Sequence, residues 1–233
     1  MDITSRISQR ATSVQRFPLF AGIPLADCIE IISAAEENHF SRRQIIFFQG
    51  DPIRHIILLL SGYAKVSQFG PSGQEVILRL NGPGELVGML GLHAKGNHRS
   101  TARAVQVATA LVWDAVHFDA VSDLFPLLRR NTARVLERRL HELEQRFREI
   151  STERVSPRLS SELVRLLTQI GKRVDDVVEI GLSREELAQL IGTTLFTVSR
   201  LLSQWESRGI VSARREMVLV RNVQALMDLS QSQ

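Results

Sequence analysis

Residues 182–211 decide the fold of the C-terminal part of the chain, and they read LSREELAQLIGTTLFTVSRLLSQWESRGIV. The stretch opens with a capping box, because the hydroxyl of Ser183 and the carboxylate of Glu186 can bond the free backbone N–H groups that begin a helix. Gly192 then ends that helix, since glycine adopts the left-handed conformation of a helix C-terminus without strain. A short helix followed by a tight turn is therefore expected.

A second helix is expected from residue 193 or 194 to about residue 208. Two helices that cross steeply through a short turn need a small residue at the crossing and apolar residues that lock them together. Ala188, Val198 and Leu201 have this spacing around the turn glycine. The outward face of the second helix is then available to the major groove of a DNA duplex, which predicts a helix-turn-helix.

A hairpin with a basic tip follows the two helices. Residues 210–213 and 217–220 are apolar and β-rich, and two arginines lie between them. Arginine side chains in this place can contact phosphates, so the whole region predicts a winged helix-turn-helix that binds double-stranded DNA. The candidate DNA-binding residues are Ser183, Arg184, Thr194, Leu195, Phe196, Thr197, Ser199, Arg200, Arg214 and Arg215.

The N-terminal half has a different sequence pattern. From residue 40 to residue 116, short β-rich runs alternate with turns that contain glycine or proline. Evenly spaced runs of this kind predict an antiparallel sandwich or barrel. The runs are residues 45–48, 56–60, 63–66, 76–80 and 102–113. Residues 23–40, with apolar side chains at helical spacing, are expected to form a short helix in front of the first run.

A long helix is expected to join the two halves. It starts near Asp123, tolerates Pro126 in its first turn, and continues without glycine or proline to residue 150. Its apolar residues repeat every three and four positions on a highly charged helix, which favours a coiled-coil dimer over a helix packed on its own domain. These residues, called the seam below, are Ala133, Leu136, Leu140, Leu143, Phe147 and Ile150. Residues 151–156 interrupt the pattern and mark a domain boundary.

Composition narrows the function classes. Cys28 is the only cysteine, so the chain can form neither an intramolecular disulfide nor a cysteine-ligated zinc or iron–sulfur site. We expect a cytoplasmic protein without membrane contact, because the start of the chain does not resemble a signal peptide and the longest apolar run is residues 56–60. No nucleophile, base and orienting group stand out together, so neither a catalytic site, an enzyme activity nor a metal site is expected.

The chain resembles the CRP/FNR family of bacterial transcription regulators over about residues 15 to 225. Residues 182–211 carry the most specific part of the resemblance. Landmarks in the β-rich region are Phe47-x-x-Gly50-Asp51, Leu60-Ser61-Gly62 and Pro83-Gly84-Glu85. The resemblance implies an α+β chain with an N-terminal antiparallel, jelly-roll-like β-roll, a long dimerisation helix and a C-terminal winged helix-turn-helix. The expected domains are residues 1–121, 122–152 and 153–233. It also implies a homodimer on palindromic promoter sites, with RNA polymerase as a further partner.

The recognition helix departs from the common family pattern. Members of the family often carry an Arg-Glu pair before the Thr-Val-Ser-Arg stretch, whereas this chain has Leu195-Phe196 there. Glutamate can accept a hydrogen bond from cytosine, but phenylalanine cannot, although it can touch a thymine methyl group or pack inward. Arg200 is retained and can bond guanine through two hydrogen bonds. We therefore expect a half-site that keeps a guanine but differs elsewhere.

The sensor region departs further. By the resemblance, cyclic AMP contacts would fall on Gly88, Met89 and Leu90, on Arg99 and Ser100, and on Leu143 and Glu144. Methionine replaces the glutamate that holds the ribose, and Leu143-Glu144 replaces the Thr-Ser pair that reads adenine. Losing the charge-assisted hydrogen bond to the ribose alone costs about 1.5–3 kcal/mol. We expect no useful binding of cyclic AMP, so the β-roll responds to another effector or DNA binding is independent of a ligand. No bound cofactor is expected.

Two alternatives stay open at this stage. The chain can be a ligand-binding regulatory module that acts on a partner protein, although the complete wing argues against this reading. It can also be a haem- or gas-responsive regulator, because His93 and His98 lie near the candidate effector residues. No ligand spacing supports the haem reading, so ordinary loop histidines are expected.

Overall fold

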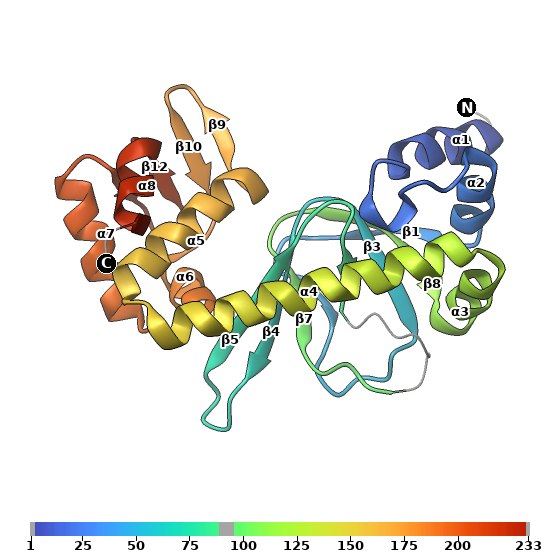
Figure 1. Cartoon of the computed structure of the whole chain (residues 1–233), viewed down its shortest axis with the longest axis horizontal. Coiled ribbons are helices and arrows are strands. Elements are labelled where there is room, and N and C mark those ends of the chain that lie inside the picture. Colours follow the sequence, from blue (N-terminus) through green and yellow to red (C-terminus); the bar gives the residue numbers. More distant parts are fainter. Residues whose placement is uncertain (1–2, 89–95, 232–233) are drawn as a thin grey trace. The chain divides into compact units, whose positions relative to one another are not determined.

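The computed structural model describes residues 3–88 and 96–231 (Figure 1). The chain divides into two compact units. The first contains residues 1–74 and 78–141, and the second contains residues 75–77 and 142–233. Within the described ranges, no helix combines the length and the apolar composition needed to cross a membrane.

The first unit is built on two four-stranded antiparallel sheets, although residues 75–77 of one strand are assigned to the second unit. One has the strand order β1-β8-β3-β6, and the other has the order β2-β7-β4-β5. The strands are β1 (Glu36–Phe40), β2 (Ile45–Phe47), β3 (His55–Ser61), β4 (Ala64–Phe69), β5 (Glu75–Asn81), β6 (Leu86–Val87), β7 (Thr101–Ala104) and β8 (Ala108–Asp114). The antiparallel β-domain predicted from the sequence is confirmed.

Helices precede and follow these sheets in the chain. They are α1 (Ile3–Val14), the 3₁₀ helix η1 (Pro18–Phe20), α2 (Leu25–Ser33), α3 (Ala115–Leu124) and α4 (Pro126–Thr152). One core lies among the strands, with Phe47, Leu59 and Val66 buried in it. A second core unites the helices with β3 and β8, and there the indole N–H of Trp113 donates to the carbonyl of Ile31 at 2.8 Å.

Three local expectations were wrong or incomplete. Residues 23–40 do not form one helix, because α2 ends at Ser33 and residues 36–40 form β1, which pairs with β8. The run 102–113 is two strands, β7 and β8. The long helix is preceded by a separate helix, α3, whose first N–H groups are capped by Asp114 through its bond from the His117 N–H at 3.0 Å.

The second unit contains a four-stranded antiparallel sheet with the order β11-β12-β10-β9. Its elements after α4 are α5 (Val155–Gln169), β9 (Lys172–Val174), β10 (Val177–Ile180), α6 (Arg184–Ile191), α7 (Leu195–Ser207), β11 (Val211–Ala213), β12 (Val218–Val220) and α8 (Val223–Gln231). The predicted winged helix-turn-helix is confirmed, whereas the β9–β10 hairpin and α8 were not predicted. Its core includes Leu163, Leu187, Leu202 and Trp205, all nearly inaccessible.

Candidate DNA-binding site

The first helix of the motif, α6, begins at the predicted capping box. The backbone N–H of Glu186 donates to the Ser183 hydroxyl at 3.2 Å, and the backbone N–H of Ser183 donates to the Glu186 carboxylate at 2.9 Å. These reciprocal bonds satisfy donors that a helix start leaves free. They fix where α6 begins and therefore where its buried residues, Leu187 and Ile191 among them, meet the core.

The turn between the helices depends on Gly192. Its φ of 66° and ψ of 52° place it in the left-handed region, and its N–H bonds the carbonyl of Ala188. The Thr193 N–H reaches the same carbonyl at 3.0 Å. A Cβ atom at position 192 would have room, with Ile150 Cδ1 the nearest atom at 3.7 Å, so the backbone conformation is what favours glycine here.

The second helix, α7, has one buried and one exposed face. Thr194 caps it, because its hydroxyl accepts the backbone N–H of Thr197 at 3.2 Å. Val198 and Trp205 are buried beneath the helix. On the outer face, Leu195 is 50% exposed, Phe196 is 77% exposed and Arg200 is exposed. Phe196 therefore points outward and not into the core.

The wing follows α7 directly. β11 and β12 pair in antiparallel register from Val211 opposite Val220 to Ala213 opposite Val218. The turn is closed by the Arg214 N–H, which donates to the Met217 carbonyl at 2.9 Å. Arg214 and Arg215 are both exposed at the tip. We call Leu195, Phe196 and Arg200 of α7, together with Arg214 and Arg215 of the wing, the recognition surface.

Two side-chain bonds hold the wing to the helices. The guanidinium of Arg184 donates to the carbonyl of Ala213 at 3.1 Å, which ties the start of α6 to the end of β11. The hydroxyl of Ser212 donates to Glu206 of α7 at 2.8 Å. Arg184, a candidate DNA contact, is thus half-buried and already bonded to the wing.

The other predicted DNA contacts are only partly free. Ser183 and Thr194 both cap helices, so their hydroxyls already have backbone partners. Thr197 shares a hydrogen bond with the Thr194 hydroxyl at 2.9 Å. Thr197 and Ser199 are half-buried on α7. The structure thus places the candidates at the start of α6, on α7 and at the tip of the wing. Ser183, Arg184 and Thr194 also form hydrogen bonds within the fold.

The seam lies on α4 and is exposed over most of its length. Leu140, Leu143, Phe147 and Ile150 are 57%, 56%, 72% and 49% exposed, respectively. Ala133 is exposed too, but Leu136 is half-buried against the helical core of the first unit. The long uncovered apolar stretch therefore begins at Leu140.

The candidate effector residues are less informative. Met89 and Leu90 lie outside the described residues, as does His93. Gly88 has a φ of 88°, and its carbonyl accepts hydrogen bonds from Arg79 and Arg139, both at 3.0 Å. Arg99 is exposed and Ser100 is half-buried, while Leu143 and Glu144 are exposed on α4.

Among the described residues of this region, His98 is a buried histidine. Its ring stacks on Phe47 with centroids 3.6 Å apart, and burial lowers its pKa although the charge of Asp51 acts in the opposite direction. A neutral imidazole is therefore favoured. Within the described part of the chain, no three His, Cys, Asp or Glu side chains gather as a metal site requires.

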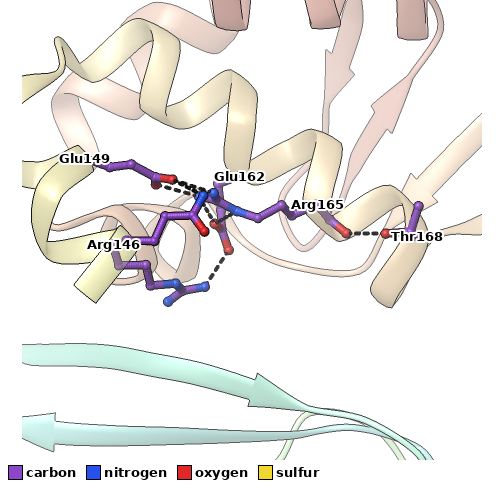
Figure 2. Close-up of polar contacts among 6 residues, drawn as sticks. Arg146, Glu149, Glu162, Arg165 and Thr168 are labelled. Carbon is purple, nitrogen blue, oxygen red and sulfur yellow. Dashed lines mark hydrogen bonds and ion pairs between the residues drawn. The ribbon is translucent and has the colours of Figure 1, made fainter. Parts of the chain in front are cut away.

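A cluster of charged residues where α4 meets α5 was not predicted from the sequence. We call Arg146, Glu149, Glu162 and Arg165 the hinge cluster (Figure 2). A signal was present, because α4 carries Arg-x-x-Glu and α5 carries Glu-x-x-Arg. The contacts join Arg146 to Glu162 and Glu149 to Arg165, but each helix alone looks like an ordinary charged surface helix.

Comparisons with known proteins agree with this geometry. A family model for the cyclic nucleotide-binding domain matches residues 37–123, and one for the Crp-like helix-turn-helix domain matches residues 157–229. The chain is 30% identical to the cyclic AMP receptor protein of Thermus thermophilus, covering 91% of this chain and 96% of that relative. It is 24% identical to the CRP-like cAMP-activated global transcriptional regulator of Mycobacterium tuberculosis, covering 91% of this chain and 95% of the relative.

A solved structure supports the fold. FixK2 from Bradyrhizobium japonicum superimposes with a TM-score of 0.73 at 20% identity, covering 85% of this chain and 98% of that one. The curated relatives are transcription regulators and not enzymes. With both domains matched in order and a relative at 30% identity along nearly the whole length, the chain belongs to the CRP/FNR family of DNA-binding transcription regulators.

Proposed function

We propose that this protein binds palindromic operators as a homodimer, with α7 of each copy in a major groove and the wing on the adjacent phosphates. The observation that carries the proposal is the outer face of α7, where Arg200 is exposed while Val198 and Trp205 anchor the helix from beneath. An arginine in this position can donate two hydrogen bonds to guanine. Leu195 and Phe196 offer apolar contact, which suits a thymine methyl group.

The seam supports the dimer. Apolar residues at heptad spacing on a helix pack into the holes of a second such helix. A contiguous apolar strip that stays exposed to water is unfavourable and indicates an interaction site. Leu143, Phe147 and Ile150 extend this strip to the end of α4. A two-fold dimer presents two copies of α7, and half-sites about one helical turn apart match such symmetry. RNA polymerase is the expected further partner, as for a regulator that acts at promoters.

We further propose that the β-roll does not respond to cyclic AMP, even though the two curated relatives are named for it. Position 89 carries a methionine in place of a ribose-binding carboxylate, and Leu143 has no group that can hydrogen-bond adenine. Titrating cyclic AMP into the protein with its operator should change DNA affinity by less than about twofold. Micromolar binding that strengthens DNA binding would contradict this part of the proposal.

The DNA-binding proposal is tested by selection from a random duplex pool with the purified full chain and no added ligand. We expect a two-fold palindrome with a guanine in each half-site. Recovery of such a sequence without ligand would also place the competent conformation in the unliganded protein. Enrichment of no sequence, with and without cell-derived small molecules, would favour a module that acts on a partner protein.

A further inference from the structure

The junction between α4 and α5 buries charge at a place where the chain turns. Only residues 153 and 154 separate the two helices. Glu149 at the end of α4 is 6% exposed and Glu162 in α5 is 2% exposed, although glutamate is rarely buried without a partner. The burial of these two carboxylates on either side of a short link must therefore be explained by the groups that they bind.

The hinge cluster supplies those partners across the junction. Arg165 donates to both oxygens of Glu149, at 2.8 and 2.9 Å, and its Nε donates to Glu162 at 2.8 Å. Arg146 of α4 donates to the other oxygen of Glu162 at 3.0 Å. Figure 2 shows the four side chains converging between the two helices, with Arg165 bonded to both glutamates. Each helix therefore contributes one cation and one anion.

A third arginine strengthens the junction. Arg158 of α5 is 7% exposed and donates to the carbonyl of Ile150 at 2.9 Å. The carbonyls of the last helical turn carry partial negative charge, so a cation is favoured there. The small pocket beside the cluster is bordered by Ile150 and, from α6, by Leu190 and Ile191. The last turn of α4 thus lies against the first helix of the helix-turn-helix.

Helix α5 is a fixed part of the winged helix-turn-helix. Leu159, Leu163 and Leu166 are inaccessible in the core of the second unit. The Ser160 hydroxyl donates to the carbonyl of Leu226 in α8. A rotation of α5 relative to the end of α4 would therefore carry α6, α7 and the wing with it.

The geometry of the cluster suits orientation more than stability. Buried ion pairs contribute little net stability, because desolvation offsets their attraction. A guanidinium that bonds two carboxylates through a planar fork, however, accepts only a narrow range of helix orientations. The seam lies on α4 and the recognition surface on α7, so the orientation held by the cluster determines where each copy of α7 stands relative to the dimer axis.

We propose that the hinge cluster consists of positioning residues that set the half-site spacing the dimer accepts. This inference rests on the proposed function. Each base pair inserted between half-sites turns one of them by roughly 35° around the duplex, so a rigid junction should reject altered spacings. A loosened junction should discriminate less between spacings, because it loses affinity for the best one.

The test uses full-length chains and the operator obtained from the random pool, with versions carrying one or two base pairs more or fewer between half-sites. The double variant Glu149→Gln with Arg165→Gln removes one cation and one anion together. We expect its affinity for the best spacing to fall by about tenfold or more while its affinities for other spacings change little, so that spacing selectivity collapses. The base preferences within a half-site should stay unchanged.

The exposed pair Asp123 and Arg129, whose side chains are 65% and 53% exposed, provides the matched control. Asp123→Asn with Arg129→Gln removes the same charges and should keep the wild-type spacing profile. A double hinge variant with the wild-type profile, or with an equal loss at every spacing, would overturn the inference. Should that variant not fold, Arg165→Lys decides, since it keeps the charge but loses the fork: full spacing selectivity in it would equally overturn the inference.

The two proposals fail in distinguishable ways. If the wild-type protein selects no palindrome, the proposed function fails whatever the cluster does. If the wild type selects a palindrome and discriminates spacing, but the hinge variants discriminate equally well, only the positioning role of the cluster fails.

Discussion

The seam on α4 and the outer face of α7 both expose large apolar side chains, but in different settings. On α4, Leu140, Leu143 and Phe147 repeat at heptad spacing along one side of a helix that is otherwise charged. On α7, Leu195 and Phe196 stand alone beside threonine, serine and arginine. A continuous strip fits a second apolar helix, whereas a mixed face fits base edges, which offer hydrogen-bonding groups and occasional methyls. The spacing of exposed apolar residues, more than their exposure, thus indicates the partner.

The largest effect is expected from breaking the seam. In the variant Leu140→Asp with Leu143→Asp, carboxylates would face each other across the dimer, so the protein should become monomeric. Affinity for a palindrome should fall by about a hundredfold or more, because the second half-site no longer benefits from linkage. Sedimentation and fluorescence anisotropy measure the two properties. Leu124→Asp, at a leucine outside the seam that is 71% exposed, is the control, and a dimer that survives the double change would refute the seam.

The next effect separates the two faces. Arg200→Ala should weaken operator binding by about 1–3 kcal/mol and relax the preference for guanine at one position of each half-site, with the dimer intact. Arg208→Ala removes an exposed arginine at the other end of α7 and serves as the control. Competition binding with single-base operator variants measures both. Uniform weakening across all sequences would instead make Arg200 a phosphate contact.

The wing should contribute a smaller and less specific effect. In Arg214→Ala with Arg215→Ala, two exposed cations are lost, so the slope of log affinity against log salt should decrease by about two. Base preferences should not change, because phosphates carry no sequence information. A titration at several salt concentrations gives the slope. An unchanged slope would mean that the wing does not reach the backbone of the duplex.

The smallest effect concerns the side of α4 that faces α5. Burial alone would raise the pKa of Glu149, but bonds from Arg165 and Gln145 and the charges of Arg165 and Arg146 outweigh it, so its pKa lies below the ordinary 4.5. Such a carboxyl stabilises the folded chain above its ordinary pKa, and the contribution is lost as the pH falls through the folded-state value.

The melting temperature should therefore decline as the pH falls below about 4.5, and more steeply in the wild type than in Glu149→Gln. The other charged groups facing Glu149 are those of the hinge cluster and Arg158. Glu137→Gln, at an exposed position of α4, should keep the wild-type slope. If the melting temperature, measured by thermal unfolding, fell equally steeply with pH in all three proteins, the partners of Glu149 would not stabilise its charged form.

Local signals explain why the helix-turn-helix was predictable. The bonds of the capping box join residues three apart, and the turn at Gly192 depends on one residue's backbone, so both can be recognised in a short window. The sequence did not determine whether Phe196 points outward or into the core, because the exposed face of a helix is known only when the core beneath it is known. Trp205 and Val198 occupy that core, and Phe196 is consequently outside.

Non-local pairing explains what was missed. The helical apolar pattern of α2 led to the prediction that the helix extends through β1. The partner of β1, strand β8, lies some seventy residues away, and tertiary pairing overrides local propensity. The hinge cluster was missed for a similar reason. Arg146 and Glu162 are ordinary helix-surface residues until the chain turns between them, and only the turn brings their charges together.

In the proposed complex, two copies of the chain are joined through α4 and bind one operator through their two α7 helices. The most direct measurement combines the stoichiometry of the complex on the selected duplex with a hydroxyl-radical footprint. We expect two chains per duplex and two protected windows about one helical turn apart. One chain per duplex, or a single window that does not depend on the palindrome, would contradict it.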